Sequence, residues 1–163
     1  MNLMMNKALV VYFSATGLTR KVAEEIVKTT GAQLEEIVPL EKYSDDDLTW
    51  TNPNSRASIE HKNPQMRPKI QLPLVNLDDY EIIYLGFPIW WGIAPAVVFS
   101  FLEMFNLANK KFMVFCTSGS SNALSAVADL NEKYPQANWI SAMRFGYGFT
   151  NRHIKQWIED NLK

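Results

Sequence analysis

The sequence predicts an α/β fold in which a parallel β-sheet carries helices on both faces. Short apolar runs, typical of strands that are buried on both sides, alternate along the chain with longer segments of helical periodicity. Three of these runs end in loops of small, hydroxyl-bearing or aromatic residues, as strands do when they lead into a binding site. With 163 residues, the chain is long enough for one domain with a substantial core.

The chain opens with a predicted strand and a predicted helix. Residues 7–13 are apolar, as expected of a central strand, and residues 17–29 place apolar side chains on one helical face. Gly31 follows at a position where glycine favours the end of a helix. A second strand is predicted at 33–38, and Pro39 ends it.

Residues 39–77 form the least regular part of the chain. They contain five prolines and the acidic run 45–47, and they show little apolar periodicity. A short helix could form around 55–61. A loop of this length inside a domain is usually a functional cover or a locally disordered segment, and both interpretations stay open. Apolar elements resume directly afterwards, so we interpret the segment as a long crossover rather than a linker.

The second half of the chain again alternates strands with helices. Pro95 falls in the first turn of a predicted helix, where proline is tolerated. The last helix is amphipathic, so one of its sides is expected to pack on the sheet. Strands are predicted at 81–87, 111–116 and 138–142, and helices at 93–105, 123–133 and 150–162.

Composition and charge exclude several classes of function. A net charge of −1 gives no basic signal for nucleic acid. Cys116 is the single cysteine, which excludes an intramolecular disulfide and fits a reducing compartment, and we expect it to be a buried structural thiol. His61 and His153 are far apart in the sequence, so no metal site is expected. No apolar segment reaches the about 20 residues of a membrane span, so we expect a cytoplasmic protein that binds neither nucleic acid nor membranes.

The N-terminus is predicted to lead directly into the first strand. The apolar run that follows Lys7 is too short for a signal peptide and lacks a small-residue cleavage pattern. Residues 1–6 are therefore predicted to be a flexible extension, and residues 7–163 a single domain.

The first loop follows the first strand and opens the first helix. Backbone N–H groups at a helix start converge on anions, the helix dipole attracts negative charge, and hydroxyls add hydrogen bonds. The loop lacks the lysine of the nucleoside-triphosphate P-loop and the Gly-x-Gly-x-x-Gly of dinucleotide sites. It therefore predicts a site for one phosphate group, although Ser14 and Thr16 could alternatively cap the helix. Its residues are Ser14, Ala15, Thr16, Gly17, Leu18 and Thr19.

Two further loops follow later strands and are expected to meet the first. In a parallel sheet with the strand order 2-1-3-4-5, the first, third and fourth strands are neighbours at the point where the order reverses. The carboxyl ends of these strands lie along one edge, so we expect the three loops to form one crevice, here called the three-loop crevice. The second loop consists of Pro88, Ile89, Trp90, Trp91 and Gly92, and the third loop consists of Thr117, Ser118, Gly119 and Ser120.

The chemistry of the three loops predicts a mononucleotide ligand. The first loop suits a phosphate, while Trp90 and Trp91 offer large flat faces and Gly92 allows the backbone to approach a ring closely. Because the two tryptophans are consecutive on a turn, at least one of them should face the crevice. A phosphate at one end and a broad heteroaromatic ring at the other describe flavin mononucleotide (FMN), whose ring is wide enough to need two loops.

The same three segments resemble the flavodoxin family. The matching residues are 12–19, 86–95 and 115–121, and the resemblance covers the chain from residue 7 onward. It is greatest for members with a Pro-x-Trp-Trp-Gly second loop and a Ser-Gly-Ser-Ser third loop. The resemblance implies a flavodoxin-like three-layer α/β/α fold, with a five-stranded parallel sheet in the order 2-1-3-4-5, and non-covalent FMN. The phosphate would lie on residues 14–19, and the ring would lie between residues 88–92 and 117–120.

The resemblance implies a redox protein whose chemistry is carried by the flavin, with no catalytic side chain. The known electron carriers of the family are strongly acidic and have aromatic and acidic residues in the third loop. The present chain has a net charge of −1 and a third loop of hydroxyls and glycine. These departures favour NAD(P)H-dependent reduction of small acceptors such as quinones, while electron transfer to a redox protein partner stays open. The alternative is a non-catalytic partner-binding or sensor module with the same fold, and both a monomer and a homodimer are compatible with the sequence.

Overall fold

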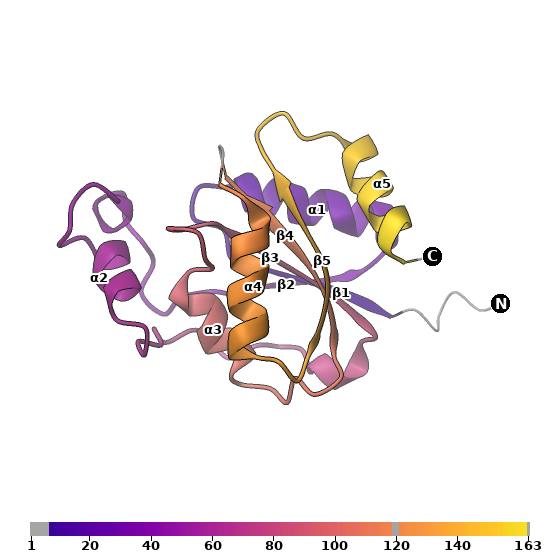
Figure 1. The fold of residues 1–163 in the computed structure, drawn as a ribbon, viewed down its shortest axis with the longest axis horizontal. Helices are drawn as coiled ribbons and strands as arrows, with labels where there is room; N and C mark the ends of the chain where they lie inside the picture. The colour runs from indigo at the N-terminus through magenta and orange to yellow at the C-terminus, as the bar shows by residue number, and fades with distance from the viewer. Residues whose placement is uncertain (1–6, 119–120, 163) are drawn as a thin grey trace.

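The computed structural model describes residues 7–118 and 121–162, so the predicted extension at 1–6 lies outside the described residues. The centre of the fold is a five-stranded sheet in which all strands run parallel, in the order β2-β1-β3-β4-β5 (Figure 1). The predicted strand order and direction are confirmed. The strands are β1 (Ala8–Tyr12), β2 (Gln33–Glu36), β3 (Ile82–Pro88), β4 (Lys111–Thr117) and β5 (Asn138–Phe145).

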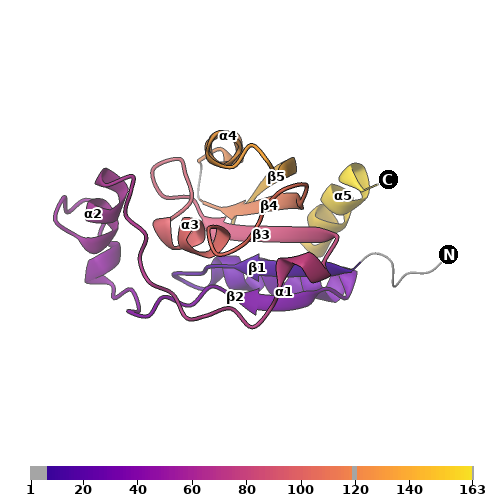
Figure 2. The same ribbon diagram turned by 90° about the horizontal axis from the view of Figure 1, so that it is seen from below.

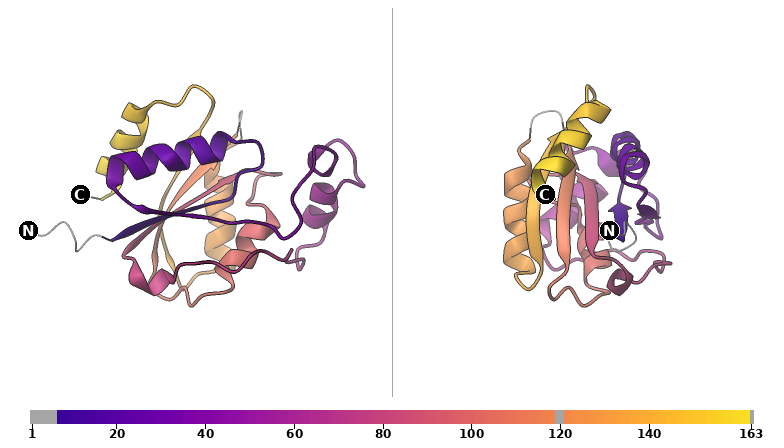
Figure 3. Two further views of the ribbon diagram at one scale, coloured as in Figure 1. Left: turned by 180° about the vertical axis from the view of Figure 1, so that it is seen from behind. Right: turned by 90° about the vertical axis from the view of Figure 1, so that its right-hand side faces the viewer.

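Helices cover both faces of the sheet. One face carries α1 (Leu18–Thr30) and α5 (Asn151–Asn161), and the other carries α3 (Ala96–Leu102) and α4 (Ala123–Lys133). Figure 3 shows α1 and α4 on opposite sides of the sheet, which confirms the predicted three-layer α/β/α arrangement. No helix within the described residues is long and apolar enough to cross a membrane.

Each central strand contributes side chains to two hydrophobic cores, one on each side of the sheet. In β1, Leu9 and Val11 pack in the core beneath α3 and α4, whereas Val10 and Tyr12 pack in the core beneath α1 and α5. This alternation of fully buried residues explains why the strand reads as a continuous apolar run in the sequence. In β4, Cys116 is fully buried, as expected, and its burial raises the pKa of the thiol.

The helix predicted at 93–105 is shorter than expected and begins later. α3 starts at Ala96, and Pro95 is its extended N-cap residue, so the prediction that Pro95 lies in the first turn is wrong. The physical reason is that a residue before proline is disfavoured in the helical region, which keeps Ala94 out of a helix. β5 also continues beyond its predicted end at residue 142, because its pairing with β4 extends to Phe145.

The irregular segment 39–77 contains the expected short helix. This helix, α2 (Arg56–Lys62), begins after Ser55, whose side chain accepts a hydrogen bond from the N–H of Ser58. α2 lies apart from the sheet, beyond the ends of its strands (Figures 1 and 2). The segment 39–77 therefore extends past the edge of the sheet at which the ligand is predicted, before the chain enters β3.

Alkaline pH is expected to destabilise the protein, because four tyrosines hold their protons more tightly in the folded state. Burial raises the pKa of Tyr12 and of Tyr84 to about 12, and burial beside carboxylates also raises the pKa of Tyr43 and of Tyr134. An unfolded tyrosine has a pKa near about 10, so this stability is fully present below about pH 10 and is lost as the pH rises toward about 12. Urea unfolding at a series of pH values measures the effect. A free energy of unfolding that stays constant between about pH 9.5 and 11 would contradict it.

Candidate functional site

The three predicted loops come together at the carboxyl edge of the sheet. The N–H of Ile89 in the second loop donates to the carbonyl of Thr117 in the third loop at 3.0 Å. The hydroxyls of Thr19 and Thr117 lie 2.7 Å apart and both residues are buried, which joins the first loop to the third. Residues 98 positions apart in the sequence are thus in direct contact at this edge.

Ser14 organises the backbone of the first loop. Its Oγ accepts hydrogen bonds from the N–H groups of Gly17 at 3.1 Å and Arg20 at 3.2 Å, so the alternative capping role of Ser14 is present in the structure. Gly17 has a φ of 104°, in the left-handed region that favours glycine, and there the chain turns into α1. The side chain of Thr16 is exposed, and within the described residues its hydroxyl has no hydrogen-bond partner.

The first loop retains unpaired donors at the N-terminus of α1. The N–H groups of Ala15, Thr16, Leu18 and Thr19 have no hydrogen-bond partner among residues 7–118 and 121–162. The helix dipole makes this end of α1 positive, and the hydroxyl of Ser14 remains able to donate. This donor set fits one phosphate group without a lysine. The hydroxyl of Thr19, in contrast, is already bonded to the third loop.

The second loop forms a tight turn between Trp90 and Ile93. Each of these two residues donates its N–H to the carbonyl of the other, at 2.9 and 3.2 Å. Trp91 has a φ of 50° and Gly92 a φ of 83°, the pattern of a type I′ turn. Across the part of the chain that the structure describes, the N–H groups of Trp91 and Gly92 find no partner. The turn therefore presents two free N–H donors. The hydroxyl of Ser125 in α4 stabilises the turn by donating a hydrogen bond to the Gly92 carbonyl at 2.7 Å.

The two tryptophans of this turn have different surroundings. Trp90 packs edge-to-face on Phe13, at the end of β1, and on Tyr43, with ring centroids 5.8 and 5.4 Å apart. Trp91 stacks on His61 of α2, with centroids 4.7 Å apart and an angle of 18° between the planes. Trp90 is therefore largely a packing residue, whereas Trp91 remains 41% exposed on the surface of the loop.

The third loop is described only in part, since Gly119 and Ser120 lie outside the described residues. Ser118 accepts a hydrogen bond on its carbonyl from the guanidinium of Arg144 at 2.8 Å, and its hydroxyl donates to the carbonyl of Ser121 at 2.9 Å. The end of β5 thus supports this loop. Sequence reasoning missed the support, because the predicted strand ended at residue 142.

Sequence reasoning also missed the contribution of the segment 39–77. The Tyr43 hydroxyl donates to the buried carboxylate of Glu60 at 2.5 Å, and the Arg56 guanidinium bonds the same carboxylate at 2.9 Å. The guanidinium also lies over the Tyr43 ring, 3.9 Å from its centroid. These contacts anchor α2 beside the second loop. The available signal was the presence of Tyr43 and His61 in an otherwise irregular, polar segment.

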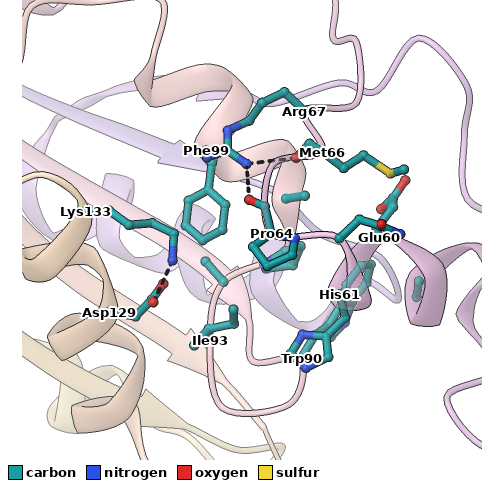
Figure 4. A pocket seen from close by; sticks show the side chains of 15 residues that line it. Glu60, His61, Pro64, Met66, Arg67, Trp90, Ile93, Phe99, Asp129 and Lys133 are labelled. Atoms are coloured by element: carbon teal, nitrogen blue, oxygen red, sulfur yellow. Dashed lines mark hydrogen bonds and ion pairs between the residues drawn. The ribbon is translucent and has the colours of Figure 1, made fainter.

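A cavity of about 270 Å³ lies beside the second loop (Figure 4). It is bounded by α2, α3 and α4, with Trp90 of the second loop in its wall, and the described residues of the first and third loops do not line it. Arg67 lies at this cavity, and its guanidinium bonds the carboxylate of Glu103 at 2.9 Å. No group of three or more potential metal ligands occurs within residues 7–118 and 121–162.

Comparison with known proteins identifies the family. A family model described as flavodoxin matches residues 7–161, nearly the whole chain. The chain belongs to the flavodoxin family. Among curated proteins, no sequence matches this chain.

Solved structures agree with this assignment. A protein of Bacteroides uniformis ATCC 8492, assigned as a flavoprotein, is 38% identical to this chain in sequence, and the two structures superpose with a TM-score of 0.90. The match covers 94% of this chain and 98% of the Bacteroides uniformis chain. A similar protein of Bacteroides eggerthii DSM 20697 is 35% identical with a TM-score of 0.91, over 96% and 98% of the two chains. A flavoprotein of Lactobacillus acidophilus NCFM, solved in complex with FMN, shares the fold at 24% identity and a TM-score of 0.75, over 93% and 98%.

Proposed function

We propose that this flavodoxin binds FMN non-covalently in the three-loop crevice and acts as a redox protein. The observation that carries the proposal is the set of unpaired N–H groups on two loops at one edge of the sheet. Four lie at the N-terminus of α1, and two lie at the tip of the second-loop turn. Unpaired donors beside a helix N-terminus are a site for a phosphate group, and donors on a turn of aromatic residues suit the polar edge of a ring. The FMN found in the Lactobacillus acidophilus relative supports the same ligand.

The residues of the chain would bind and orient the cofactor. Residues 14–19 would hold the phosphate through neutral donors, the N–H groups of Trp91 and Gly92 would donate to the ring edge, and residues 117–120 would close the opposite side. Bound FMN supplies electron or hydride transfer, and the protein tunes it through these contacts. No side chain of the crevice needs to act as an acid or a base.

We further propose that NADH or NADPH is the electron donor and that small molecules such as quinones are the acceptors. The near-neutral net charge of −1 supports this, because it provides little electrostatic steering toward a basic protein partner. Steady oxidation of NADH or NADPH in the presence of menadione is the expected result. Reduction that requires a partner reductase, with a stable flavin radical, would instead assign an electron carrier.

Binding of FMN and of riboflavin, which lacks the phosphate, tests the proposed site. We expect about one FMN per chain, bound at least about a hundredfold more tightly than riboflavin, because the phosphate accepts several charge-assisted hydrogen bonds. Flavin fluorescence titration of the purified protein measures both affinities. Equal affinities would place the phosphate outside the first loop, and a protein that binds neither compound would overturn the proposed function.

A further inference from the structure

The second-loop turn has a backbone conformation that is unfavourable for one of its residues. Trp91 has a φ of 50°, in the left-handed region, where a bulky side chain strains the backbone. A conformation of this kind persists only where its surroundings favour it. The contacts around Trp91 therefore determine the shape of a wall of the three-loop crevice.

The indole ring of Trp91 stacks on a side chain from outside the three loops. The imidazole ring of His61 lies nearly parallel to the indole, with centroids 4.7 Å apart. The ion-pair and hydrogen-bond network of Glu60, Tyr43 and Arg56 fixes the helix that carries His61. A further bond, from Arg56 to the carbonyl of Glu41 at 2.8 Å, ties α2 to the chain before it. The position of His61 is thus set by α2 and its anchors, one of which, Tyr43, also packs on Trp90 of the second loop.

We propose that His61 is a positioning residue for the flavin ring. It covers one face of the Trp91 indole and so holds the left-handed turn, which keeps the N–H groups of Trp91 and Gly92 free. Trp91 is 41% exposed although it is stacked on His61, so the rest of its surface remains available to a ring. This inference rests on the proposed binding of FMN and extends the site to the segment 39–77.

In the alternative, His61 would occupy the face of the Trp91 indole that the flavin ring needs, and the two rings would compete for it. In that case, loss of the imidazole would tighten flavin binding. The anchored α2 and the unfavourable φ of Trp91 both favour positioning, because without His61 the turn can relax and must be re-formed when the ring binds. The two arrangements predict changes of opposite sign in the dissociation constant.

Three variants test the proposal in the full chain. His61→Ala is expected to weaken the binding of FMN about threefold to tenfold, the worth of one aromatic contact. His61→Phe retains a flat ring and is expected to restore the affinity to within about twofold of the wild type. Ile59→Ala is the matched control, since Ile59 is on the same helix and, like His61, is exposed. It is expected to leave the affinity unchanged.

Measuring the affinity for riboflavin, which lacks the phosphate, distinguishes an effect of His61 on the ring from an effect on the phosphate site. Because His61 acts through the ring wall, His61→Ala is expected to weaken riboflavin and FMN by the same factor and to change the visible circular dichroism of bound FMN. Unchanged affinity, tighter binding, an equal loss in Ile59→Ala, or no recovery in His61→Phe would each overturn the proposal. If the wild type binds no FMN, the proposed function fails and the role of His61 fails with it. If the wild type binds FMN and His61→Ala binds it equally well, only the role of His61 fails.

Discussion

Replacement of Gly86 by alanine is expected to destabilise the protein by about 3 kcal/mol, the upper end of the usual cost of overpacking. A Cβ at this position would lie 2.0 to 2.6 Å from three atoms of the Phe115 ring. Gly86 is in β3 and pairs with Phe115 in β4, and Phe115 is fully buried in the core beneath α1 and α5. Because the Phe115 ring is fully buried, we expect that the strands or the core must shift to accommodate the Cβ.

Urea unfolding measures this loss, and two further variants identify its cause. Gly86→Ala combined with Phe115→Leu is expected to be more stable than the sum of the two single changes predicts, because the smaller side chain removes the clash. Gly148→Ala is the matched glycine control, since a Cβ there meets nothing within 4 Å. A loss below about 1 kcal/mol in Gly86→Ala, or strict additivity in the double variant, would contradict the close approach of Gly86 and Phe115.

Gly17→Ala is expected to weaken the binding of FMN about tenfold. Gly17 has a φ of 104°, and a Cβ there meets nothing within 4 Å, so the cost of the substitution is conformational rather than steric. Without ligand, the first loop of the variant can relax toward a backbone that alanine prefers. Binding of the phosphate must then restore the strained form, at a cost of about 1–2 kcal/mol.

Gly31→Ala provides a matched control at the other end of the same helix. Gly31 has a φ of 74°, and a Cβ there also meets nothing within 4 Å. Its replacement is expected to lower the free energy of unfolding by about 1 kcal/mol while the affinity for FMN stays unchanged. Fluorescence titration and urea unfolding of both variants measure the two effects. Full retention of FMN affinity in Gly17→Ala would contradict the phosphate site at the first loop. A non-catalytic module would bind no flavin in either form and would tolerate the substitution.

The arrangement of the sheet was largely predictable because its information is local. Apolar runs such as residues 9–12 are buried on both sides of the sheet, and an unbroken apolar run in the sequence predicts such burial directly. Gly31 ends α1 with a φ of 74°, as a glycine after a helical pattern predicts. The end of β5 at Phe145 was less predictable, since its last residues are held by pairing with β4 rather than by an apolar pattern.

The sequence by itself determined the parallel sheet, its helices, the three loops and the class of ligand that their residue types suit. Only the tertiary structure decided how the two tryptophans divide their roles, with Trp90 against Tyr43 and Trp91 against His61. It also decided that Thr19 bonds Thr117 instead of remaining free at the first loop. The physical reason is that these contacts join residues from different elements. Which residues meet depends on how the connecting segments cross the edge of the sheet. The periodicity of the sequence does not predict the course of those segments.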